Sequence, residues 1–280
     1  MTTLKRTSRY VRVAHLAYQL TRAAFPLYRR RKSKKTFTQP QLAACVLLMF
    51  YVDQSYRDFE EWLLASDRVC AALGLTTIPD HSTLNRAVQR LTVIRLTRLL
   101  TRLLDQLKIK ESIIAGDSTG YTLSRASAYY RTRSGKRYRG WVKGSYTVGT
   151  ESQFILVAYS SRRASANDAR MLQPLRDGAR PYRRRDWVFL GDAGFDSRAV
   201  TARDLVPPIR RGGRLVDPKR KARADLVAQA RLDGLFGQRW KTETVHSVIK
   251  RKFGDHIRSI RKDRQSREPL IKAVVYNLHR

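Results

Sequence analysis

Residues 187–194 read Trp-Val-Phe-Leu-Gly-Asp-Ala-Gly, and residues 113–118 read Ile-Ile-Ala-Gly-Asp-Ser. Both are short apolar runs followed by Gly, Asp and a small residue, a pattern typical of a buried strand that ends in a turn. We expect the strands to present Asp192 and Asp117 at their carboxyl ends. Because ligands of open α/β sheets bind beyond those ends, the two carboxylates are predicted to meet at one sheet edge.

Residues 236–250 read Phe-Gly-Gln-Arg-Trp-Lys-Thr-Glu-Thr-Val-His-Ser-Val-Ile-Lys, the pattern of the start and body of a helix. The helical period places Arg239, Glu243 and Lys250 on one stripe. Such a stripe suits phosphate chemistry, because the carboxylate can hold a metal ion while the cations hold phosphates. The alternative is a solvated face on which Arg239 and Glu243 form an ordinary i,i+4 ion pair. Two aspartates and this glutamate can form an oxygen-only site for one or two Mg²⁺ ions.

The chain resembles the DDE transposases of bacterial insertion sequences in three acidic positions, in the order Asp117, Asp192 and Glu243. The spacing Phe236-x2-Arg239-x3-Glu243-x6-Lys250 is similar to the Tyr-x2-Arg-x3-Glu-x6-Lys signature of that family, with Phe in place of Tyr. Residues 191–196 resemble the segment around the second aspartate of the family. The resemblance covers residues 37–280.

The resemblance implies metal-dependent cleavage of transposon DNA ends and strand transfer into target DNA. Asp117, Asp192 and Glu243 would bind two Mg²⁺ ions, for which Mn²⁺ could substitute, while Arg239 and Lys250 would bind DNA phosphates. The implied partner is double-stranded DNA, bound by a homodimer or a larger assembly. The alternatives are a ribonuclease-H-like nuclease without strand transfer and a catalytically silent DNA-binding remnant; a strand-transfer assay would discriminate them.

The chain has 280 residues and a formal net charge of +34, with 57 Lys and Arg against 23 Asp and Glu. Such an excess indicates a polyanionic partner, although a structural nucleic-acid binder would have the same charge. The two cysteines, Cys45 and Cys70, lie in apolar helical patterns without zinc spacing. The sequence begins without a signal-peptide core, and its longest apolar run, residues 42–52, is about half of a membrane span. We expect a soluble, cytoplasmic protein. The chain ends at Arg280 within a helical pattern, as it would if a few residues were missing.

Residues 1–107 are predicted to form an all-helical DNA-binding domain that resembles a helix-turn-helix arrangement. Thr38, Ser55 and Asp80 are expected to cap helices, and the second of these helices is expected to continue to residue 73. Residues 79–86, Pro-Asp-His-Ser-Thr-Leu-Asn-Arg, resemble part of the N-terminal domain of the same transposase family. The basic run at residues 29–35 is either a solvated linker or a contact to the DNA backbone.

Residues 108–280 are predicted to form an α/β catalytic domain, a ribonuclease-H-like mixed sheet flanked by helices. The expected strands lie at residues 112–115, 141–150, 154–160 and 187–190, with a short edge strand at 206–209. Asp196 is expected to cap a helix that ends near residue 205, and Asp217-Pro218 to act as a break within the basic and polar residues 210–231. Trp240 is expected in the core, and a last helix at residues 270–278.

The loop at residues 129–139 combines tyrosines with cations. This composition suits contact with single-stranded or distorted DNA, with Arg137 and Arg139 as the DNA-binding residues. The alternative is a hairpin whose tyrosines pack on the sheet.

Overall fold

The computed structural model describes residues 7–28, 30–32, 34–123, 133, 141–162, 167–210, 212 and 215–280. The chain forms two compact units, one of residues Met1–Gln106 with Ile271–Arg280 and the other of Leu107–Leu270. The division into an N-terminal DNA-binding domain and a catalytic domain stays a prediction.

The first unit is helical and consists of α1 (Arg9–Ala24), α2 (Gln39–Tyr51), α3 (Tyr56–Leu64), α4 (Asp67–Ala72), α5 (His81–Arg90), α6 (Val93–Gln106) and the greater part of α12 (Glu268–His279). Nearly every residue of α2 is buried, as expected for a helix that is apolar all round. Thr38, Ser55 and Asp80 each accept a hydrogen bond from the backbone N–H three residues later, which confirms the predicted caps. The helix expected to reach residue 73 is two helices, because the chain turns at Ala65 and Ser66.

The second unit contains a mixed five-stranded sheet in the order β3-β2-β1-β4-β5. Its strands are β1 (Glu111–Thr122), β2 (Trp141–Gly149), β3 (Ile155–Ser161), β4 (Arg183–Leu190) and β5 (Asp204–Leu205). The pairs β1–β2 and β2–β3 are antiparallel, whereas β1–β4 and β4–β5 are parallel. This order and these directions define a ribonuclease-H-like sheet, as the sequence predicted.

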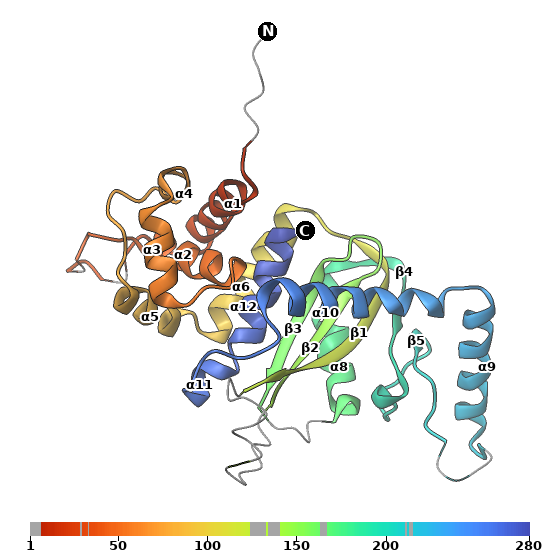
Figure 1. Cartoon of the computed structure of the whole chain (residues 1–280). Coiled ribbons are helices and arrows are strands. Elements are labelled where there is room, and N and C mark those ends of the chain that lie inside the picture. Colours follow the sequence, from red (N-terminus) through yellow and green to blue (C-terminus); the bar gives the residue numbers. More distant parts are fainter. Residues whose placement is uncertain are drawn as a thin grey trace. The chain divides into compact units, whose positions relative to one another are not determined.

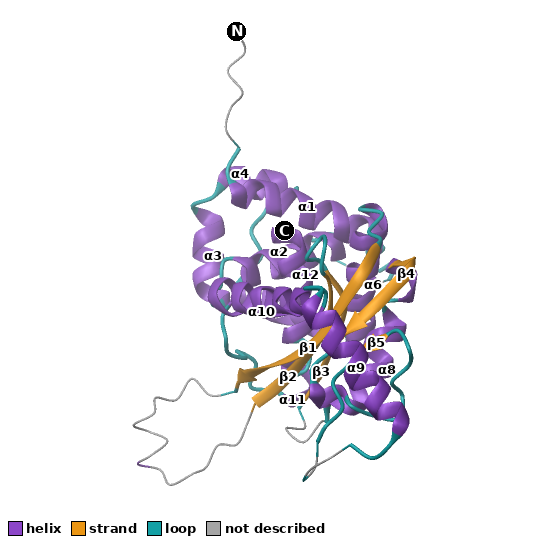
Figure 2. Cartoon of the chain, turned by 90° about the vertical axis from the view of Figure 1, so that its right-hand side faces the viewer, coloured by secondary structure: helices purple, strands orange, loops and turns teal. Residues whose placement is uncertain are grey.

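Among the described residues of this unit, the helices and 3₁₀ turns are α8 (Asp168–Gly178), η1 (Arg180–Tyr182), η2 (Ala193–Phe195), α9 (Pro218–Leu232), η3 (Phe236–Arg239), α10 (Trp240–Phe253), α11 (Lys262–Gln265) and the start of α12. Helices α8 and α10 lie on opposite faces of the sheet (Figures 1 and 2). Neighbouring residues of β2 show the same division. The Tyr146 ring lies 5.6 Å from the ring of His246 in α10, while Thr147 donates a hydrogen bond to the carbonyl of Leu175 in α8 (2.9 Å).

Strand β1 is much longer than predicted and does not end at Asp117, which lies inside the strand opposite Tyr146. The expectation that this aspartate ends its strand is therefore wrong. Residues 116–120 contain two glycines, yet the backbone pairs continuously with β2. Gly116 is required by close packing, because a Cβ there would stand 2.4 Å from the ring of Phe189.

Two further expectations for this unit are wrong, and the helix at residues 236–250 differs from a regular α-helix at its start. No helix follows Asp196; the chain turns through residues 197–203 and reaches the short edge strand β5, two residues before the predicted one. Asp217 and Pro218 do not break the chain but begin α9, with Asp217 as the N-cap and Pro218 in the first turn. The helix expected from Phe236 starts as the 3₁₀ turn η3 and becomes α-helical only at Trp240.

Candidate active site

Asp117 lies on the α10 face of β1, since successive residues of a strand face opposite sides. Its Oδ2 atom accepts from the hydroxyl of Thr242 (3.4 Å) and lies 3.8 Å from the guanidinium of Arg239 and 3.7 Å from Nδ1 of His246. Burial raises the pKa of Asp117, and the nearby carboxylates of Asp192 and Glu243 raise it further. The Ser118 N–H and Arg239 act in the opposite direction.

Asp192 is brought close to Asp117 by the parallel pairing of β1 with β4. Ala115 is the partner of Leu190, and each aspartate lies two residues beyond that pair. The Oδ1 atom of Asp192 is buried, and none of the described residues gives it a hydrogen bond. Gly194 allows this position, because a Cβ there would stand 3.0 Å from the same oxygen.

Glu243 lies in the first turn of α10 and is exposed. Its Oε1 accepts from Arg239 at 2.7 Å, so the i,i+4 pair considered from the sequence is formed. The same guanidinium lies near Asp117, and it therefore stands between two carboxylates. Arg239 thus connects the exposed Glu243 to the strand that carries Asp117.

His246 lies one turn beyond Glu243 and is buried against Tyr146 and Asp117. Burial lowers the pKa of His246 to about 4, and the charges of Lys250 and Arg239 lower it in the same direction. The imidazole is therefore neutral at pH 7 in spite of its acidic neighbour. Its Nε2 atom is buried and has no hydrogen-bond partner among the described residues.

On the opposite face of the sheet, a polar network supports the residue next to Asp117. Ser118 donates a hydrogen bond to Asp168 Oδ1 (2.6 Å), which also pairs with the ammonium of Lys143 at 2.7 Å. The Ser118 hydroxyl lies 2.8 Å from that of Ser145. This network connects β1 and β2 to the first residue of α8.

The acidic residues suit a hard divalent cation, because Mg²⁺ prefers oxygen ligands and a buried, unpartnered carboxylate oxygen gains from a cation. Asp192 Oδ1 is such an oxygen, and Asp117, whose pKa is raised first by burial and further by the charges of Asp192 and Glu243, would also gain from a cation. Within the described ranges, however, no three His, Cys, Asp or Glu side chains stand close enough to hold an ion. The pairing of Glu243 with Arg239 provides a physical reason, since it holds this carboxylate to a cation of the protein.

Four further residues were singled out from the sequence, and the structure describes two of them, Lys250 and Trp240. Lys250 is partly exposed and close enough to His246 to lower its pKa. Arg137 and Arg139 lie outside the described residues. The expectation that Trp240 belongs to the core is wrong, because 54% of its surface is exposed.

Sequence reasoning missed His246, Thr242 and the network of Lys143 with Asp168. The spacing of His246, three residues after Glu243, was a usable signal, because residues three apart share a helix face. Nothing in the sequence pointed to Lys143, whose partner lies on a helix 25 residues away in the chain.

A ribonuclease-H-like sheet with acidic residues on and beside its central strands defines an enzyme of the nuclease and strand-transfer class. Residues 108–278 match the family described as the transposase DDE domain. The match spans more than half of the chain, so the protein belongs to this family and is a DDE transposase. No curated protein and no solved structure matches the chain. None of the described helices is long and apolar enough to cross a membrane.

Proposed function

We propose that Asp117, Asp192 and Glu243 are the acidic residues that bind the divalent metal ions used for cleavage of transposon ends and strand transfer. The observations that carry this proposal are the register of Ala115 with Leu190, which brings Asp117 and Asp192 close together, and the buried Oδ1 atom of Asp192, which has no hydrogen-bond partner among the described residues. Members of the family generally use divalent metal ions. We also propose Mg²⁺ as the ion, with Mn²⁺ as a substitute, and an origin among the insertion sequences with the Tyr-x2-Arg-x3-Glu-x6-Lys signature.

The reaction needs no protein nucleophile. In the first step water adds to phosphorus, the P–O3′ bond breaks, and the proton of the water ends on the released 3′-oxygen. In the second step this 3′-hydroxyl attacks a target phosphodiester in line, and the displaced 3′-oxygen takes the proton. When bound, divalent ions lower the pKa of the attacking hydroxyl and neutralise charge on the phosphoryl oxygens.

The residues of the chain orient the metal-binding carboxylates and neutralise the charge of DNA phosphates. The sheet fixes Asp117 and Asp192 relative to each other through the pairing of Ala115 with Leu190. Glu243 has to leave Arg239 before it can join them, and the released guanidinium is then free to bind a DNA phosphate, for which its fork of donors is suited. Lys250, two turns beyond Glu243, would bind a further phosphate as a point charge.

The direct experiment measures binding, cleavage and strand transfer separately, with DNA that contains the ends of the element. Asp117→Asn, Asp192→Asn and Glu243→Gln should each abolish Mg²⁺-dependent cleavage while DNA binding in Ca²⁺ persists. Lys250→Ala should weaken cleavage and end binding but leave Mn²⁺ affinity nearly unchanged. Cleavage that persists in any of the three acidic variants would contradict the assignment of that residue.

Two outcomes distinguish the alternatives to transposition. Hydrolysis without joining to target DNA would indicate a plain nuclease. DNA binding without either reaction would indicate a silent remnant. We expect both reactions, carried out by a homodimer or larger assembly on double-stranded DNA.

A further inference from the structure

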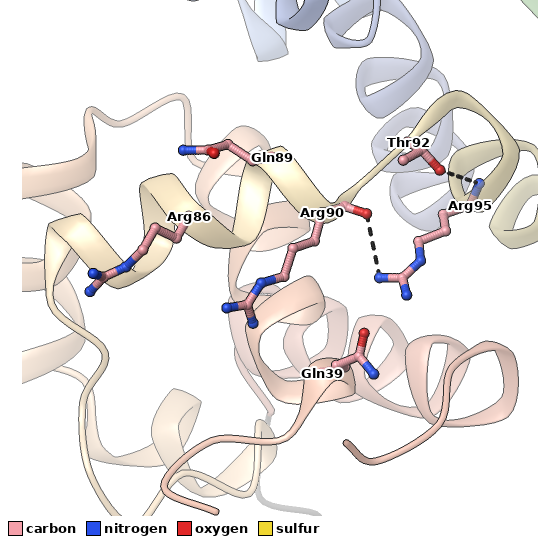
Figure 3. Close-up of a pocket in the computed structure, with 6 residues that line it drawn as sticks. All are labelled: Gln39, Arg86, Gln89, Arg90, Thr92 and Arg95. Carbon is pink, nitrogen blue, oxygen red and sulfur yellow. Dashed lines mark hydrogen bonds between the residues drawn. The ribbon is translucent and has the colours of Figure 1, made fainter. Parts of the chain in front are cut away.

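The helical unit contains a basic cleft whose lining residues come from α2, α5, α6 and the α5–α6 connection (Figure 3). The cleft has a volume of about 520 Å³, within the range of ligand-binding pockets. We call it the arginine cleft, and its lining residues are Gln39, Arg86, Gln89, Arg90, Thr92 and Arg95. Three of these six are arginines and none is acidic.

The arginines of α5 are placed side by side by the helical period. Arg86 and Arg90 are four residues apart and therefore lie on one face, while Leu84, Ala87 and Val88 are buried on the other. Like charges at this spacing destabilise a helix by a few tenths of a kcal/mol. Within the described ranges, no carboxylate lies within 4.0 Å of either guanidinium. The face thus concentrates positive charge that an external anion would neutralise.

The third arginine is held in place by the protein. Arg95 lies in the first turn of α6, its guanidinium lies 5.2 Å from the centre of the Phe25 ring, and it donates a long hydrogen bond to the Arg90 carbonyl (3.4 Å). Figure 3 shows the side chains of Arg90 and Arg95 extending on the side of the cleft where Gln39 lies. A guanidinium already ordered by its neighbours loses less conformational entropy when it binds a ligand.

The wall formed by Gln39 has an unsatisfied polar atom. Gln39 is 7% exposed, its Nε2 donates to the Pro26 carbonyl at 3.3 Å, and its Oε1 has no partner among the described residues. A buried amide oxygen without a donor is unfavourable. A water molecule held between Gln39 and a phosphate oxygen would donate to both of these acceptors.

We infer that the arginine cleft binds phosphates of the DNA backbone. Guanidinium groups bind phosphate oxygens with two parallel hydrogen bonds, and the amides of Gln39 and Gln89 supply polar groups of lower charge. Arg86 and Arg90 are separated by about 6 Å along the helix axis, so each can contact a different phosphate of one strand. The inference rests on the proposed function only in requiring that the chain binds DNA; it does not depend on the assignment of the catalytic carboxylates.

The test measures how steeply affinity depends on salt, because each phosphate contact contributes about 0.9 to the slope of log affinity against log salt. The full chain is titrated with a labelled mixed-sequence duplex in Ca²⁺, so cleavage is not part of the readout. The double variant Arg86→Gln/Arg90→Gln should flatten the slope by about 1.8, and by a similar amount for duplexes of different sequence. The matched control is Arg57→Gln/Arg68→Gln, which removes two exposed charges of the same unit outside the cleft and should leave the slope unchanged.

Equal flattening in both double variants would attribute the effect to net charge and overturn the inference. An unchanged slope in the cleft variant, with folding verified by circular dichroism, would also overturn it.

A second arm titrates inorganic phosphate alone. If the cleft variant loses phosphate binding without any change in the DNA slope, the site takes a small free anion and the inference is wrong. Loss of cleavage in Glu243→Gln with an unchanged slope in the cleft variant would refute this inference alone, whereas the reverse result would refute only the catalytic assignment.

Discussion

Arg239 donates a hydrogen bond to Glu243 at 2.7 Å while its guanidinium also lies 3.8 Å from Asp117. The guanidinium of Arg239 therefore lies next to two proposed metal ligands, and a metal ion has to compete with it for their carboxylates. We predict that Arg239→Gln strengthens Mn²⁺ binding to the DNA-free protein several-fold, measured by calorimetry, and weakens DNA cleavage, because the phosphate contact is lost. Arg251→Gln, which removes an exposed charge from the same helix, should change neither quantity much. Weaker Mn²⁺ binding in Arg239→Gln would show that the arginine assembles the site instead of competing for it.

The buried His246 should make the protein less stable at acid pH. Its folded pKa of about 4 lies below the ordinary value of 6.5, so the unfolded chain binds a proton at pH values where the folded protein does not. Stability is therefore lost as pH falls through this interval, by about 2 kcal/mol between pH 7 and pH 5. Asp117, whose pKa is raised, changes the stability with pH in the opposite direction. It is present both in the unmodified protein and in the His246→Gln variant used for the comparison.

The measurement is urea unfolding at pH 7 and pH 5. His246→Gln should lose much of the pH dependence of the unfolding free energy, whatever its stability at pH 7. A variant that is destabilised at pH 7 but keeps the full pH dependence would show that His246 is not the titrating group.

Lys143 and Asp168 should be energetically coupled. The Lys143 side chain is 9% exposed and that of Asp168 is 27% exposed, so the removal of either partner leaves a poorly solvated charge. We expect Lys143→Met and Asp168→Asn each to lower the free energy of unfolding by about 1–3 kcal/mol, less than for a fully buried pair. The double variant should lose clearly less than the sum, with a coupling of about 1 kcal/mol or more. Additive losses would mean that the ion pair is not formed in solution.

Asp196 should stabilise helix α9 and should not take part in DNA cleavage. Its carboxylate accepts hydrogen bonds from Arg220 (2.6 Å), Arg223 and the Ile209 N–H (2.8 Å), and its side chain is 9% exposed. Asp196→Asn leaves two arginines without a counter-charge, so we expect a loss of about 1–3 kcal/mol and faster amide exchange in α9.

The folded fraction of the Asp196→Asn variant should still cleave DNA, in contrast to Asp192→Asn. Asp225→Asn, at an exposed position of the same helix, is the matched control and should be nearly neutral in stability. Inactivity of folded Asp196→Asn at the level of Asp192→Asn would contradict a purely structural role.

The apolar runs and caps allowed most elements to be predicted, because burial and capping leave local signals. The failures have physical causes that are not local. The first strand was predicted at residues 112–115 with Asp117 at its end, but pairing with β2 continues it to Thr122, and Gly116 gives room to Phe189. Helix α9 has only a narrow buried stripe at Val227 and Ala230, so its basic and polar sequence did not indicate a helix.

The site residues that could be predicted from the sequence are those that directly follow an apolar strand. Asp117 and Asp192 were predicted to meet because each follows an apolar strand, and the register of Ala115 with Leu190 supports their proximity. The role of Asp196 was predicted wrongly, because a residue at a turn can cap a helix or bind distant arginines, and the sequence around it is the same in both cases. Its partners in α9 depend on tertiary structure.

The helical unit is assembled from two separate parts of the chain, residues Met1–Gln106 and Ile271–Arg280. The second part contributes buried residues such as Ile271 and Val274, and His279 lies 3.2 Å from the hydroxyl of Tyr51. A ribosome must therefore synthesise the intervening stretch of about 160 residues before this core can close, which takes on the order of ten seconds or more at 5–20 residues per second. During that interval the nascent chain exposes apolar surface of its first helices. Expression in cells should accordingly be sensitive to chaperone capacity and to the speed of translation.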